Sequence, residues 1–82
     1  MTEEQKRIIS DELKLQRFKN KITQEEMAEA LKITRRTYIT LENNPGKLNI
    51  AQSFIISDVL NWNLCNFIWS ITSQNVTSEE VK

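Results

Sequence analysis

Two helix-start signals stand eleven residues apart near the middle of this 82-residue chain, and their spacing restricts the fold more than any other feature. The first is the run Thr23-Gln24-Glu25-Glu26, a capping box. In a capping box the Thr23 hydroxyl accepts a hydrogen bond from the backbone N–H of Glu26. The Glu26 carboxylate in turn accepts a hydrogen bond from the backbone N–H of Thr23. The second signal begins at Thr34, with Thr37 three residues later. A helix that begins after Thr23 therefore has to end near Leu31.

Apolar residues around both signals strengthen them. Ile22 precedes the first cap and Met27 follows it, which is the spacing of a hydrophobic staple, and Ile33 and Tyr38 repeat this arrangement at the second cap. Only residues 32–34 remain to connect the two helices. Two short helices joined by so tight a turn form a helix-turn-helix motif.

Two further helices are expected after the stop signal Asn43-Asn44-Pro45-Gly46. They cover residues 50–60 and 64–72, and Asn61 between them suits the left-handed end of a helix. The side chains expected to turn inward are Phe54, Ile55, Ile56 and Val59 on the first helix, and Leu64, Phe67, Ile68 and Ile71 on the second.

The length of the chain corresponds to one small domain. A first helix is expected from the N-cap Thr2 to about Asn20, so the helical domain covers residues 1–73 and leaves 74–82 as a polar, flexible tail. The single cysteine, Cys65, excludes an internal disulfide, and the charged N-terminus does not resemble a secretory signal. Because no stretch is apolar enough to span a membrane, we expect a reduced, cytoplasmic protein without membrane contact.

Several kinds of chemistry are disfavoured by the composition. The chain has no histidine, so it lacks the commonest general base and the commonest metal ligand. One cysteine without histidine leaves no plausible zinc site. Gly46 is the only glycine, which excludes a glycine-rich phosphate loop. We therefore expect neither an enzyme nor a bound cofactor or metal.

Positive charge is concentrated in the middle of the chain, although the formal net charge is zero. Residues 13–47 carry eight basic and four acidic side chains, a surplus of four positive charges. Residues 1–12 and 48–82 each carry a surplus of two negative charges. A positive centre is what a surface that faces phosphates requires, although a surplus of this size also arises by chance in ordinary solvated surfaces.

The run TQEEMAEALKITRRTYITLEN, together with its flanks over residues 13–68, resembles the helix-turn-helix domain of the phage Cro/C1 repressors, the XRE family. The resemblance is carried by both caps, by the small Ala28 and by the closing Leu41-Glu42-Asn43. It implies an all-α, compact five-helix lambda-repressor-like bundle that reads the major groove of DNA with the helix over residues 34–43. The implied partner is double-stranded DNA with a pseudo-palindromic operator, bound by a homodimer.

The resemblance also implies roles for individual residues. Base readout falls to Thr34, Arg35, Arg36 and Thr40. Phosphate contacts fall to Thr23, Gln24, Asn43, Asn44 and Lys47. The arginine pair alone would more often be an ordinary solvated helix start; within the matched motif we interpret it as DNA-facing.

A structural ion pair is expected between Arg17 and Glu42. In the family that this chain resembles, an arginine near the end of the first helix commonly pairs with the glutamate that closes the recognition helix. The pattern of the sequence agrees, because Arg17 follows Ile9 and Leu13 on the buried stripe of the first helix. An arginine in that position needs a carboxylate partner.

Two positions depart from the family pattern, and the second of them leaves another function open. Lys32 occupies the turn position where family members usually carry glycine, and Ile39 stands on the outward side of the recognition helix. An apolar Ile39, together with Trp69 and Phe67, suggests a dimer or partner interface. The alternative to a DNA-binding repressor is therefore a protein-interaction module of the same fold, such as an antirepressor or an antitoxin.

Overall fold

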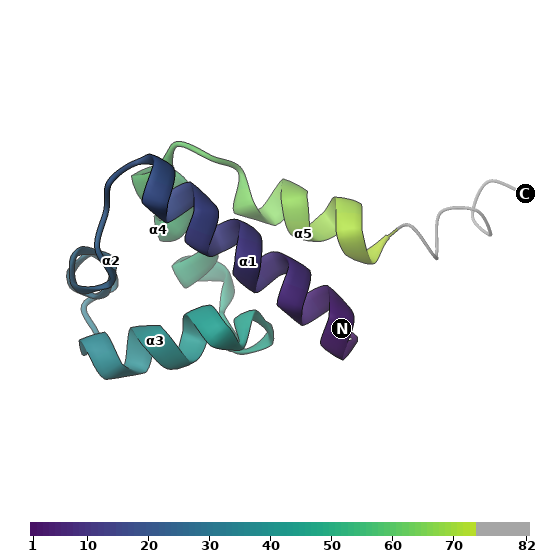
Figure 1. The fold of residues 1–82 in the computed structure, drawn as a ribbon, viewed down its shortest axis with the longest axis horizontal. Coiled ribbons are helices and arrows are strands. Elements are labelled where there is room, and N and C mark those ends of the chain that lie inside the picture. Colours follow the sequence, from purple (N-terminus) through teal and green to yellow (C-terminus); the bar gives the residue numbers. More distant parts are fainter. Residues whose placement is uncertain (74–82) are drawn as a thin grey trace, which may run out of the picture.

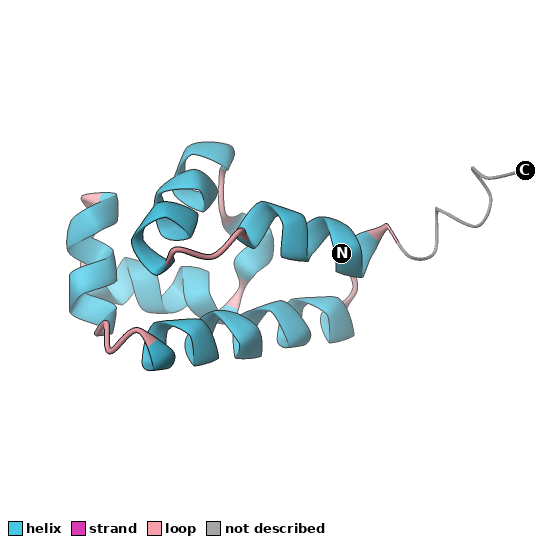
Figure 2. Ribbon diagram, turned by 90° about the horizontal axis from the view of Figure 1, so that it is seen from above, coloured by secondary structure: helices cyan, strands magenta, loops and turns pink. Residues whose placement is uncertain are grey.

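Helix boundaries in the computed structural model, which describes residues 1–73, follow the capping residues of the sequence (Figure 1). The described part contains, in order, α1 (Glu3–Lys19), α2 (Gln24–Leu31), α3 (Arg35–Asn43), the short 3₁₀ helix η1 (Pro45–Lys47), α4 (Ile50–Leu60) and α5 (Leu64–Thr72). Figure 2 shows only helices and loops over these residues. The predicted all-α class and the five α-helices are confirmed; the predicted tail over 74–82 lies outside the described residues.

The predicted caps are formed by local hydrogen bonds. The Thr23 hydroxyl accepts from the Glu26 N–H at 3.1 Å, and the Glu26 carboxylate accepts from the Thr23 N–H at 2.8 Å. At the start of α3 the Thr34 hydroxyl accepts from the Thr37 N–H at 3.1 Å. Such caps satisfy N–H groups that have no partner within the helix, so they fix where each helix begins.

The longest helix, α1, runs diagonally through the molecule in Figure 1. α1 packs against α3, α5 and η1, whereas α2 packs against α3 and α4, and α4 against α5. Each of the five helices contributes to one buried apolar cluster, which consists of Ile9, Leu13, Met27, Ala28, Leu31, Tyr38, Ile56, Leu60 and Leu64. Within residues 1–73 no helix has both the length and the apolar character to cross a membrane.

The predicted orientation of α4 is wrong in part. Ile56 is buried and Val59 is partly buried, as expected, but Phe54 and Ile55 are exposed. The buried residues of α4 are Ser53, Ile56 and Leu60, at positions i, i+3 and i+7. The sequence IAQSFIISDVL places apolar residues around the whole helix, so its periodicity does not select one face. The packing against α2 and α5 selects it instead.

The turn between α2 and α3 places Lys32 in the left-handed conformation, with φ 59° and ψ 42°. This geometry lets the N–H of Ile33 bond to the carbonyl of Ala28 at 3.0 Å, which closes the end of α2. Asn61 ends α4 in the same conformation, as predicted, with φ 50°. Asparagine tolerates this region better than lysine does.

We expect Lys32→Gly to raise the free energy of unfolding by about 1 kcal/mol, because glycine removes the left-handed strain. The gain is reduced by the greater freedom that glycine gives the unfolded chain. Urea denaturation of the variant beside Lys32→Gln, which removes the charge but keeps Cβ, measures the effect. Equal stability of the two variants would contradict a role for backbone strain.

Candidate nucleic-acid interface

The two sides of α3 differ sharply in exposure. Tyr38, Leu41 and Glu42 are buried and hold the helix in place. Thr34, Arg35, Arg36, Thr40 and Asn43 are exposed. Arg36, Thr40 and Asn43 share one stripe away from the buried residues, whereas Arg35 lies one turn before Tyr38, at the edge of the groove that also contains Arg17. Neither arginine forms an ion pair or a side-chain hydrogen bond with any other residue of the described part. Two guanidinium groups thus stand free at the start of an anchored helix, with their donors available to an external acceptor.

Thr34 and Thr40 have partly engaged hydroxyls. Thr34 caps α3 and also donates to the hydroxyl of Thr37 at 2.9 Å. Thr40 donates to the backbone carbonyl of Arg36 at 3.2 Å. For outside contacts each threonine retains its methyl group and an unused lone pair.

Ile39 is less outward than the sequence suggests. It is half-buried rather than exposed, so it is not a free apolar side chain in the middle of the recognition surface. Phe67 is also half-buried, packs against the core and lies 5.4 Å from the ring of Trp62. Of the three residues expected at a dimer or partner interface, only Trp69 is largely exposed, at 66%.

A groove of about 990 Å³ lies where the end of α1, the N-terminus of α2 and the start of α3 meet. Its lining brings Lys21 and Arg35 together with Thr23, Gln24 and one carboxylate, Glu25; Arg17 also lines it, but its charge is balanced by Glu42. The N-terminus of α2 adds the positive end of the helix dipole to this groove. The combination suits an anionic group such as a DNA phosphate.

A buried carboxylate, Glu42, ties α1, α2 and α3 together. Arg17 approaches it from α1, with Nε 2.9 Å from Oε2 and Nη2 3.4 Å from Oε1. The third nitrogen of that guanidinium, Nη1, donates to the Ile22 carbonyl at 3.1 Å. From α2 the Gln24 amide donates to Oε1 at 3.0 Å, and within α3 the Tyr38 hydroxyl donates to Oε2 at 2.8 Å. The Arg17–Glu42 ion pair is thus the centre of a four-residue network.

Burial raises the pKa of Tyr38 far above its ordinary value of 10.0, and the negative charge of the neighbouring Glu42 raises it further. The hydroxyl therefore remains protonated near neutral pH and keeps donating to the carboxylate. The bond from Tyr38 to Glu42 could have been predicted from the sequence, because Tyr38 precedes Glu42 by one helical turn. The bond from Gln24 to Glu42 could not, because these residues are 18 positions apart.

The residues expected to contact phosphates differ in availability. Asn43 and Lys47 are exposed at the end of α3 and in η1. Asn44 is half-buried, and its side-chain oxygen is buried without a hydrogen-bond partner in the described part. The Thr23 hydroxyl already serves the α2 cap, and Gln24 has one amide N–H left after its bond to Glu42. No cluster of three or more potential metal ligands occurs within residues 1–73.

Two short helices, α2 and α3, are joined by a tight turn, and α3 is anchored by buried residues while it exposes two arginines. These features define a helix-turn-helix DNA-binding domain. A family model described as helix-turn-helix matches residues 13–64, from the buried Leu13 of α1 to the buried Leu64 of α5. The protein belongs to this family and is of the Cro/C1 type. Searches among curated proteins and among solved structures found no match.

Proposed function

We propose that this protein is a sequence-specific transcriptional regulator that inserts α3 into the major groove of its operator. The observation that carries the proposal is the pair of exposed arginines, Arg35 and Arg36, which form no ion pair within residues 1–73 and stand at the start of a helix anchored by Tyr38, Leu41 and Glu42. In helix-turn-helix proteins the first residues of the second helix reach the base edges. An arginine there forms two parallel hydrogen bonds with O6 and N7 of a guanine.

Phosphate contacts on either side of the groove would fix the orientation of α3. On one side, the free amide N–H of Gln24 and the N-terminus of α2 face the cationic groove that also contains Lys21. On the other side, Asn43 and Lys47 follow α3 and are exposed. Such contacts position the domain but carry no sequence information, so specificity would depend on Arg35 and Arg36, with Thr34 and Thr40 as additional base contacts.

The regulator would act as a homodimer on a pseudo-palindromic operator and repress by occupying it. Two copies of α3 related by a twofold axis would enter successive major grooves, about 34–36 Å apart. Trp69, on the last turns of α5, is the most exposed aromatic side chain of that helix and supports a dimer contact there.

For the dimer we expect sedimentation equilibrium to show a reversible monomer–dimer equilibrium that Trp69→Ser weakens at least about tenfold, the effect of losing one central aromatic contact. Phe54→Ser removes a similarly exposed aromatic from α4 and is the matched comparison. A stronger effect of Phe54→Ser would move the dimer contact to α4.

Selection of bound duplexes from a random pool at physiological salt tests the function itself. We expect enrichment of a site with two inverted half-sites whose centres lie about 10 base pairs apart, each containing guanine. The affinity for the recovered duplex should fall steeply as salt increases, because counterions are released from the phosphates. Recovery of unrelated sequences only would contradict the proposal.

The second candidate function is a protein-interaction module, such as an antirepressor or an antitoxin. It is favoured by the apolar outer side of α4, where Ile50 is 74% and Phe54 is 61% exposed. Such a surface on a small chain commonly marks a protein contact. An empty DNA selection together with salt-insensitive binding to a partner regulator would support this candidate over the first.

A further inference from the structure

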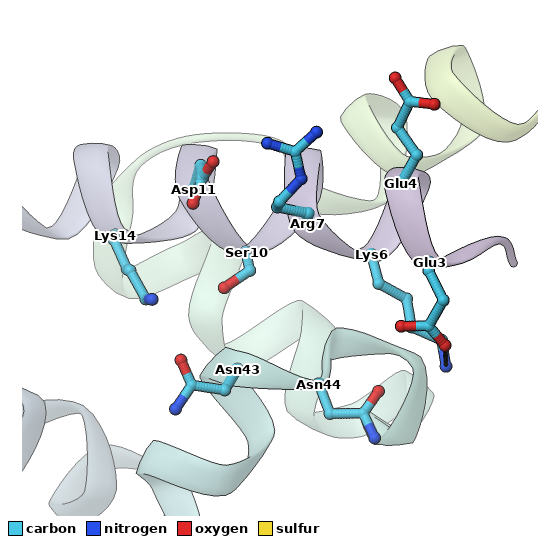
Figure 3. Close-up of a pocket in the computed structure, with 9 residues that line it drawn as sticks. All are labelled: Glu3, Glu4, Lys6, Arg7, Ser10, Asp11, Lys14, Asn43 and Asn44. Atoms are coloured by element: carbon cyan, nitrogen blue, oxygen red, sulfur yellow. Dashed lines mark hydrogen bonds and ion pairs between the residues drawn. The ribbon is translucent and has the colours of Figure 1, made fainter.

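A second groove, of about 850 Å³, lies between the N-terminal half of α1 and the C-terminal end of α3 (Figure 3). Its α3 side is formed by Asn43 and Asn44. Asn43 follows Arg36 and Thr40 on the same stripe of α3, at i+7 and i+3 respectively, and all three are exposed. The groove therefore opens at the edge of the surface proposed to face DNA.

The charged side chains of this groove are not evenly distributed. At its outer end Lys6 is paired with Glu3 at 3.3 Å. Figure 3 shows the side chains of Glu4 and Arg7 directed away from α3. Asp11 also lines the groove and forms no ion pair with Lys14. At the inner end Lys14 forms no ion pair with any residue of the described part. The part of the groove nearest to α3 is thus left with one unneutralised cation.

Three hydrogen-bonding groups converge on that inner end. The ammonium of Lys14 and the hydroxyl of Ser10, one turn earlier on α1, are both directed towards the carboxamide of Asn43 (Figure 3). Ser10 is 5% exposed as a residue and lines the groove. An ammonium, a hydroxyl and an amide provide several donors around one space, and phosphate oxygens accept from such donors.

We propose that Lys14, Ser10 and Asn43 form a binding site for a phosphate of the DNA strand that passes the C-terminal end of α3. This inference rests on the proposed function and extends the DNA-binding surface from the helix-turn-helix onto α1. A phosphate there and a phosphate in the groove at the N-terminus of α2 would hold α3 from both of its ends. Both contacts would act on any sequence, because they involve only the backbone of the duplex.

The test measures binding of Lys14→Gln by fluorescence anisotropy, with the duplex selected by the wild-type protein and with a random duplex, from 50 to 300 mM salt. We expect about a tenfold loss of affinity at low salt on both duplexes, since the contact is a charge-assisted hydrogen bond. The slope of log K against log salt should become shallower by about 0.9, the value for one phosphate. Lys14→Arg should restore most of the affinity.

Lys19→Gln is the matched control, because it removes the same charge from an exposed position of α1 that does not line this groove. Identical affinities and slopes for Lys14→Gln and Lys19→Gln, with wild-type binding intact, would overturn this site and leave the proposed function standing. A wild-type protein that binds neither duplex would overturn both. Thermal unfolding should be unchanged in Lys14→Gln, since Lys14 is exposed and unpaired among the described residues.

Discussion

Glu42→Gln should lower the free energy of unfolding by about 3 kcal/mol, a large part of the stability of a chain this small. The carboxylate is fully buried and accepts from Arg17, Gln24 and Tyr38. Glutamine keeps the shape but removes the charge that balances the guanidinium, whose side chain is 19% exposed. It also turns an amide N–H group towards donors, which leaves some of them without an acceptor. Urea denaturation measures the change.

The Glu3–Lys6 pair provides the control for this prediction. The Glu3 side chain is 93% exposed, so Glu3→Gln should change stability little. Arg17→Met/Glu42→Gln completes a double-mutant cycle, and its loss should be clearly smaller than the sum of the two single losses, because each single change leaves a charge or a donor unpaired. A Glu42→Gln variant as stable as Glu3→Gln would show that the network does not hold the helices together.

Replacing Arg35 and Arg36 together by alanine should weaken binding to the selected duplex by about 100-fold or more. Each bidentate arginine–guanine contact contributes roughly 1–3 kcal/mol of discrimination. Stability should be nearly unchanged, because neither side chain pairs with another described residue. Anisotropy titrations with the selected duplex and with a random duplex measure the effect, and the loss should be larger on the selected one.

Arg7→Ala/Lys19→Ala removes two positive charges from exposed positions of α1 and is the matched control. It should weaken binding to the two duplexes equally and only modestly, through the general electrostatic attraction. If the Arg35→Ala/Arg36→Ala variant also loses affinity equally on both duplexes, then Arg35 and Arg36 contact phosphates and other residues read the bases.

The helix boundaries could be predicted from the sequence because they depend on chemistry within four residues. Thr23 with Glu26, and Thr34 with Thr37, fix the starts of α2 and α3 through bonds between near neighbours. The buried side of α3 was also predictable, since Tyr38 and Leu41 share one helical face. These predictions needed no knowledge of how the helices pack.

Features that depend on tertiary packing were not predictable in the same way. The exposure of Phe54 and Ile55 depends on which side of an apolar helix meets α2 and α5. The bond from Gln24 to Glu42 joins residues of different helices, and so does the approach of Lys14 to the end of α3. Contacts between residues of different helices cannot be predicted from local sequence patterns. The assignment of particular residues to bases and phosphates remains a prediction for the same reason.

Arg35 and Arg36 have no side-chain partner among residues 1–73, which has a consequence for the history and the engineering of this domain. Side chains that contribute nothing to the scaffold can be exchanged without altering how the chain folds. Target preference and folding are therefore free to diverge independently at these two positions. A library randomised at positions 35 and 36 would be expected to yield many folded members with new operator preferences, whereas one randomised at position 42 would not.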